Sequence, residues 1–103
     1  MKYAVGNKVI VVIPAEEITV GYITTWPGIT SAMKEYNYTM GIVVSIHASD
    51  KEVCGSRPAD SKYKYPLYKV KIEEGEFYYP GAWLLPLTKE NLRIVEFIRK
   101  VKK

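Results

Sequence analysis

The chain has 103 residues, 48% of them hydrophobic and 25% charged, which predicts one folded domain and excludes a disordered polar segment. Its longest apolar run, Val9 to Ile13, excludes a membrane-spanning helix, and its single cysteine, Cys54, excludes an internal disulfide, so we expect a cytoplasmic protein. The net charge of +4 lies wholly in the last fifteen residues, because the residues before them carry nine Lys/Arg and nine Asp/Glu, and this excludes a body that is basic throughout.

Short β-branched and aromatic runs, separated by turn signals, predict five antiparallel strands. The first, Lys8 to Ile13, has apolar residues at both parities and should be covered on both faces. The other four are Thr39 to His47, Leu67 to Ile72, Phe77 to Tyr79 and Leu84 to Leu87. In the second strand, alternation divides the residues into two sets: Met40, Ile42, Val44 and Ile46 face one way, and Gly41, Ser45 and His47 face the other, with Val43 as the exception.

The connections differ greatly in length. Two are long, Pro14 to Tyr38 and Ala48 to Tyr65, and loops of this length in a compact domain are often functional. The first should contain one helical turn over Ser31 to Tyr36, with Thr30 or Ser31 as its N-cap. By contrast, Glu73 to Glu76 should be a tight hairpin turn in which Gly75 supplies the positive φ.

The end of the chain predicts an amphipathic helix over residues 89–102, with Thr88 as its N-cap. One broad arc of this helix is apolar: Leu92, Ile94, Val95, Phe97, Ile98 and Val101. An arc this wide should be buried, and the expected site is the open side of the sheet, against Val9 to Ile13. The alternative is a dimer interface, so we expect a monomer or a weak homodimer through the helix.

Several short motifs resemble those of small SH3-like domains encoded by bacteriophages and mobile elements. They are Val5-Gly6-Asn7-Lys8-Val9, Met33-Lys34-Glu35-Tyr36, the glycine-led valine strand Gly41 to Ile46, the hairpin Tyr68 to Gly75 and the closing Trp83-Leu84. The turn Pro80-Gly81 before Trp83 is also how small SH3-like barrels end. The resemblance implies a mainly β fold: a five-stranded antiparallel SH3-like barrel over residues 5–87, with long first loops and the C-terminal helix outside it.

Residues that could carry catalysis are few. His47 is the only histidine and stands at the end of a predicted strand, and Cys54 lies in a polar loop with no second cysteine. No phosphate-binding loop, dinucleotide fingerprint or serine-based triad is present in the sequence. We therefore expect no enzyme, no cofactor and no metal site.

Aromatic residues in and beside the long loops predict a binding function instead, because Trp and Tyr dominate binding hot spots. The candidate contact residues are Trp26, Tyr36, Tyr38, Tyr63, Tyr65 and Trp83. Trp26 either anchors its loop on the barrel or contacts a partner. The sequence thus predicts a non-catalytic protein-binding module, and the resemblance implies a phage or mobile-element accessory protein that blocks or redirects a host protein.

The alternative is a small barrel that binds nucleic acid. Tyr63-Lys64-Tyr65 alternates aromatic and basic groups, as platforms that stack single-stranded bases do. The basic C-terminal helix would add phosphate contacts through Arg93, Arg99 and Lys100.

Overall fold

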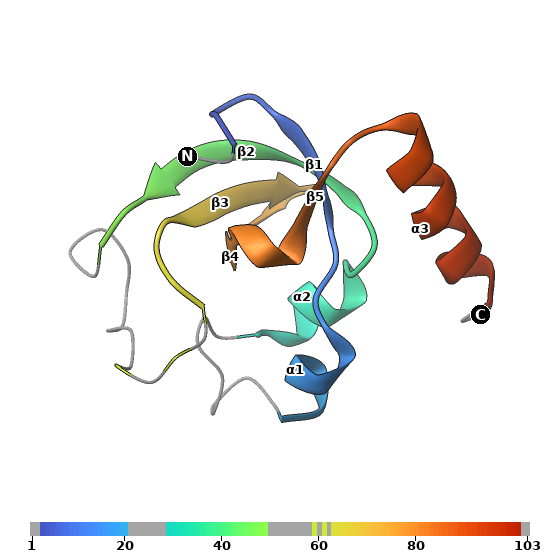
Figure 1. Cartoon of the computed structure of the whole chain (residues 1–103), viewed down its shortest axis with the longest axis horizontal. Coiled ribbons are helices and arrows are strands. Elements are labelled where there is room, and N and C mark those ends of the chain that lie inside the picture. Colours follow the sequence, from blue (N-terminus) through green and yellow to red (C-terminus); the bar gives the residue numbers. More distant parts are fainter. Residues whose placement is uncertain (1–2, 21–28, 50–58, 60, 62, 102–103) are drawn as a thin grey trace.

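The computed structural model describes residues 3–20, 29–49, 59, 61 and 63–101, without the side chains of residues 18–20 and 101. In chain order its elements are β1 (Lys8–Val11), α1 (Ala15–Val20), α2 (Ser31–Glu35), β2 (Met40–His47), β3 (Leu67–Ile72), β4 (Gly75–Pro80), the 3-10 turn η1 (Gly81–Trp83), β5 (Leu84–Pro86) and α3 (Lys89–Val101). The strands form one antiparallel sheet in the order β4-β3-β2-β1-β5 (Figure 1). This confirms a mainly β, five-stranded antiparallel sheet with a C-terminal helix. Among the described residues β4 and β5 do not pair, so the sheet is open and the expected barrel closure is not shown.

The main core lies on one face of the sheet, which we call the inner face. All five strands and the turn before β5 contribute residues to this core: Val9, Val11, Val43, Tyr68, Val70, Ile72, Tyr79, Trp83 and Leu84. Ile29 and Met33 close it from the β1–β2 connection. Ile10 is also fully buried but belongs to the other face, as the prediction of a doubly covered first strand requires.

A β-bulge corrects the predicted alternation of β2. The register with β3 shifts between Val43 and Ser45. Before the bulge, Gly41 and Val43 are buried on the inner face, while Met40 and Ile42 point to the outer face. After it, Ile46 packs against the core. The prediction that Met40, Ile42 and Ile46 share a face was wrong because one extra residue reverses the phase of the strand.

The β3–β4 hairpin also departs from expectation. Ile72 pairs with Gly75, so the turn has only two residues, and Glu73, not Gly75, has the positive φ, 54°. Gly75 has a different role: a Cβ there would lie 2.6 Å from the Phe77 ring in its present position. The glycine makes room for an aromatic side chain that packs against the core.

Side-chain hydrogen bonds fix the connection between β1 and β2. As predicted, Thr30 caps α2: its hydroxyl accepts from the Met33 N–H at 3.2 Å. Asn37 fixes the chain just after β1: its Oδ1 accepts from the Ile13 N–H, and its Nδ2 donates to the Ile13 carbonyl. The short helix α1 has no counterpart among the predicted elements. Its first turn carries two glutamates, which suit a helix N-terminus, but Ile18, Thr19 and Val20 are β-branched and favour strands.

The C-terminal helix is confirmed, but its apolar arc is only partly buried among the described side chains. Thr88 caps it, accepting from the Asn91 N–H at 3.1 Å. Val95 is buried, and Leu92 and Ile98 are partly buried, whereas Ile94 and Phe97 are 54% and 69% exposed. α3 runs along the side of the molecule where β1 and β5 lie (Figure 1). Ile10 and Val95 are both buried, and neither belongs to the main core.

Neighbouring residues of α3 should therefore differ in their contribution to stability. We expect Val95→Ala to lower the free energy of unfolding by about 2 kcal/mol, because two buried methyl groups are lost. Ile94→Ala should change it by no more than about 0.5 kcal/mol, because that side chain is largely in water. Urea unfolding of the two variants compares them directly. Equal losses would show that the helix is buried on both sides.

The buried Tyr79 hydroxyl should make the fold sensitive to alkali. It has no hydrogen-bond partner among the described residues, and burial raises the pKa of Tyr79 above its usual value of about 10. The folded state thus keeps this proton while the unfolded chain loses it. Above about pH 10 the unfolded state binds fewer protons, so the free energy of unfolding should fall as the pH rises.

Tyr79→Phe removes the unpaired hydroxyl. It should raise the free energy of unfolding by about 1 kcal/mol at neutral pH and flatten the decline above pH 10. Urea unfolding at neutral pH and again above pH 10 measures the two effects. Tyr78→Phe, at the half-exposed neighbouring position, is the control for loss of one phenol. A Tyr79→Phe variant less stable than the parent protein would indicate that the hydroxyl has a partner.

Candidate protein-contact surface

The predicted contact residues of the β2–β3 connection pack inward. The Tyr63 ring meets the Trp83 ring edge-on, with centroids 5.0 Å apart, and the Tyr63 hydroxyl donates to Glu17 Oε1 at 3.1 Å. Trp83, the last residue of η1, has no exposed surface and fills the core. A partner therefore cannot contact its ring, and the prediction of Trp83 as a contact residue was wrong. Tyr65 is partly buried, and Trp26 lies outside the described residues.

Tyr36 and Tyr38 follow α2, and both are half-buried. The Tyr36 ring packs against Phe77 with centroids 6.0 Å apart, and the nearby Glu73 carboxylate raises the pKa of its hydroxyl. Tyr38 has a φ of 65°, and its N–H donates to the Val11 carbonyl at 2.7 Å. Both residues thus have structural contacts that bind the connection to the sheet.

The residues of the nucleic-acid alternative do not form one surface platform. Tyr63 is partly buried and packs against Trp83 and the main core, so part of its ring is covered by the protein. Lys64 is exposed, as are Arg93, Arg99 and Lys100 on α3. On a helix Arg93 and Lys100 share a face and Arg99 lies about a quarter turn or more away, so the three do not form one stripe.

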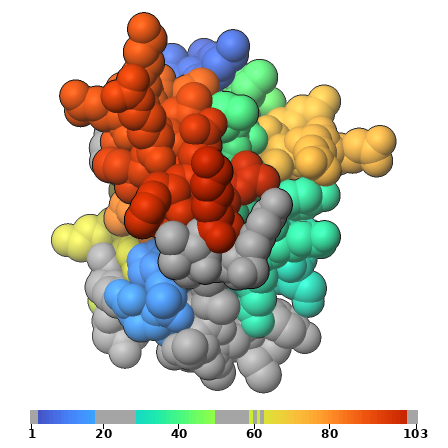
Figure 2. Space-filling view, turned by 90° about the vertical axis from the view of Figure 1, so that its right-hand side faces the viewer, coloured from blue at the N-terminus to red at the C-terminus, as the bar shows by residue number. Residues whose placement is uncertain are grey.

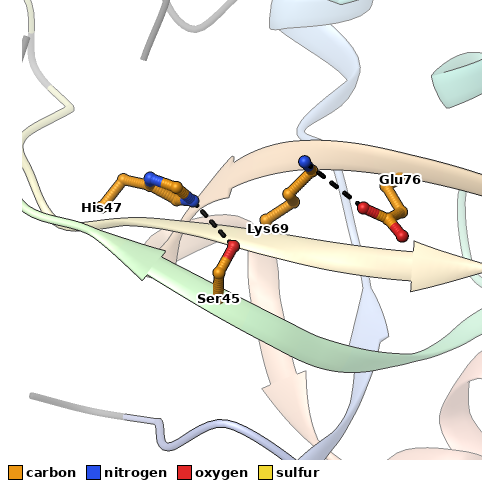
Figure 3. Close-up of polar contacts among 4 residues, drawn as sticks. All are labelled: Ser45, His47, Lys69 and Glu76. Carbon is orange, nitrogen blue, oxygen red and sulfur yellow. Dashed lines mark hydrogen bonds and ion pairs between the residues drawn. The ribbon is translucent and has the colours of Figure 1, made fainter. Parts of the chain in front are cut away.

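Ser45 and His47 form a polar contact on the outer face of β2 (Figure 3). Their Oγ and Nε2 atoms are 2.7 Å apart, the distance of a serine nucleophile from its base. However, His47 Nδ1 is buried and has no hydrogen-bond partner among the described residues. A proton on Nδ1 would leave a buried N–H without an acceptor, so we assign the proton to Nε2, which donates to Ser45. In this tautomer the imidazole cannot accept the serine proton.

The polar residues beside this pair form a second contact. Lys69 lies opposite Ser45 on β3, and its ammonium is 3.3 Å from a Glu76 carboxylate oxygen (Figure 3). The same ammonium lies 5.6 Å from the centre of the Tyr78 ring. The polar side chains in this half of the outer face are therefore paired with one another, Ser45 with His47 and Lys69 with Glu76. Within the part of the chain that the structure describes, no three His, Cys, Asp or Glu side chains gather as metal ligands do, and no helix is long and apolar enough to cross a membrane.

A shallow groove occupies the other half of the outer face, over β1, β2 and β3. Its volume is about 460 Å³. It is lined by Lys8, Met40, Gly41, Ile42, Lys71, Glu73 and Leu87, and we call this surface the outer groove. In Figure 2 this side of the molecule shows β2 in green between α3 in red and the β3–β4 hairpin in amber.

The floor of the outer groove is apolar although it is in water. Met40 is 54% exposed and Ile42 is 44% exposed, in the central strand of the sheet. Ile42 pairs with Lys8 on one side and with Lys71 on the other, so one row across three strands reads lysine, isoleucine, lysine. Sequence analysis missed this row because the predicted phase of β2 turned Ile42 toward the same side as Ile46.

The chain matches no protein-family model, no curated protein and no solved structure. Function is therefore inferred from the exposed surface and its chemistry.

Proposed function

We propose that this protein is a non-catalytic protein-binding module whose contact surface is the outer groove. The observation that carries the proposal is the exposure of Met40 and Ile42 on the central strand β2, on the face that lies opposite the main core. Large aliphatic side chains in a groove lose contact with water when a partner covers them, and this provides binding free energy. Grooves with an apolar floor and polar margins are typical of protein-contact surfaces.

The remaining polar chemistry supports binding without catalysis. No described residue hydrogen-bonds to His47 Nδ1, and the Lys69 ammonium contacts Glu76 and Tyr78. The charged residues of the outer groove are two lysines and one glutamate, and no serine, cysteine or histidine is among its described lining residues. No residue set among the described side chains combines a nucleophile, an oriented base and a cavity.

The strand order β4-β3-β2-β1-β5 and the 3-10 turn before a short last strand support the SH3-like part of the expectation. We propose an SH3-like fold on these grounds. The phage or mobile-element setting, with a host protein as partner, rests on the sequence motifs alone. Fold by itself does not select a partner, so the contact surface has to be tested directly.

Site-specific photo-crosslinking tests the proposed surface in the cells that express the protein. A photoreactive amino acid replaces Ile42 in one variant and Glu74, at the exposed tip of the β3–β4 hairpin, in a control. We expect a discrete protein adduct from position 42 and none of that size from position 74. Adducts with nucleic acid alone, equal adducts from both positions, or none from position 42 would each overturn the proposal.

A further inference from the structure

The charges around the outer groove indicate the chemistry of its occupant. Lys8 and Lys71 are exposed, and neither makes an ion pair among the described residues. Glu76 lies opposite Lys71 in the register, but its carboxylate contacts Lys69 at 3.3 Å. The third charged residue of the groove, Glu73, lies at the hairpin end and interacts with Tyr36. Two uncompensated ammonium groups thus stand on either side of an exposed Ile42.

We propose that the outer groove binds an acidic segment of a partner protein, in which carboxylates flank an aliphatic side chain. This inference rests on the proposed function and specifies its ligand. The apolar residue would cover Ile42 and Met40, and the carboxylates would meet Lys8 and Lys71. Strands in a sheet are about 4.8 Å apart, so the two lysine Cα atoms are separated by about 10 Å. An extended or helical segment can place two carboxylates at that separation.

Two other occupants fit the groove less well. A second copy of this chain would insert the exposed apolar residues of α3, Ile94 and Phe97. The described part of that helix, however, carries four basic residues against two glutamates: Lys89, Arg93, Arg99 and Lys100. Its positive charge would oppose Lys8 and Lys71. Single-stranded nucleic acid binds through aromatic stacking, and the groove floor is aliphatic.

Synthetic peptides test the inference. In the probe peptide a central Leu is flanked by Glu two residues before and two residues after it; matched peptides carry Gln or Lys at the flanks. NMR titration of the labelled protein gives affinity and location together. We expect the Glu peptide to shift the resonances of Met40 and Ile42 and to bind about tenfold more tightly than the Gln peptide, because two exposed ion pairs together add a modest attraction.

Charge reversal provides the decisive variant. The double change Lys8→Glu with Lys71→Glu should exchange the preference, so that the Lys peptide binds about tenfold more tightly than the Glu peptide. The matched control is Arg93→Glu with Lys100→Glu on α3, which makes the same change in net charge and should leave the preference unchanged.

The outcomes separate this inference from the proposed function. Equal binding of the Glu and Gln peptides at Met40 and Ile42 would overturn the acidic specificity and leave the groove as a protein-contact surface. No shift at these residues with any peptide, while photo-crosslinking from position 42 succeeds, would also overturn the inference alone. A single-stranded oligonucleotide that shifts Lys8 and Lys71 when no peptide does would overturn both.

Discussion

Trp83→Ala should lower the free energy of unfolding by about 3–5 kcal/mol, the range for loss of a large buried aromatic side chain. Trp83 is fully buried and belongs to the main core. Its ring contacts Tyr63, whose hydroxyl reaches Glu17 of α1, and its carbonyl accepts from the Val12 N–H at 2.8 Å. The indole thus supports the main core and, through Tyr63 and Glu17, the two long connections. Since domains of this size have about 5–15 kcal/mol of stability, this single change should remove a large part of it.

Urea unfolding followed by circular dichroism measures this loss without relying on the tryptophan signal. Trp83→Phe is the matched control: it keeps an aromatic ring and removes the Nε1–H, which is buried without a partner among the described residues. The Phe variant should lose no more than about half as much stability as the Ala variant. A Trp83→Ala protein within about 1 kcal/mol of the parent would show that this ring does not organise the core.

Gly41→Ala should also be strongly destabilising, by about 2–3 kcal/mol, and Gly41→Val should prevent folding. In most strands the opposite sign is expected, because replacing glycine reduces the entropy of the unfolded chain. Here a Cβ at position 41 would lie 2.4 Å from Val70 Cγ1, 2.9 Å from Ile72 Cγ1 and 3.0 Å from the Lys71 carbonyl oxygen. The first two atoms belong to buried side chains and the third to the backbone, so none can move away at low cost.

Gly75→Ala is the control for Gly41→Ala. A Cβ at position 75 would also be too close to a neighbour, but that neighbour is the far end of the partly exposed Phe77 ring. The ring can turn away, so we expect a loss of about 1 kcal/mol or less. Thermal melts of the two alanine variants give the comparison. A Gly41→Ala protein as stable as the parent would mean that β2 and β3 are farther apart at this point.

Regular patterns in the sequence predict the strands well. β3 matches its predicted bounds at both ends, and β1, β2, β4 and β5 differ by one to two residues. The α2 and α3 caps, Thr30 and Thr88, follow from local chemistry: a hydroxyl immediately before a helix accepts an otherwise unpaired N–H. These features depend on neighbours in the chain, so they can be read without knowledge of the tertiary structure.

Features that depend on distant residues could not be predicted. The bulge between Val43 and Ser45 is set by pairing with β3, and it alone decides that Ile42 faces outward. The positive φ of Glu73 follows from a register that starts β4 at Gly75. The apolar arc of α3 predicts a buried helix, but Ile94 and Phe97 are largely exposed in the folded chain. The outer groove therefore appears only when the strands are assembled.

The most direct test compares the outer groove with the exposed apolar residues of α3. The partner obtained by crosslinking is purified, and its affinity is measured for Ile42→Ser in the outer groove and for Ile94→Ser on α3, side chains that are 44% and 54% exposed. Thermal melts confirm that both variants fold. We expect Ile42→Ser to weaken binding about 30-fold or more, the hot-spot scale of about 2 kcal/mol, and Ile94→Ser to change it by less than about twofold. A loss confined to Ile94→Ser would contradict the outer groove as the contact surface and place the interface on α3.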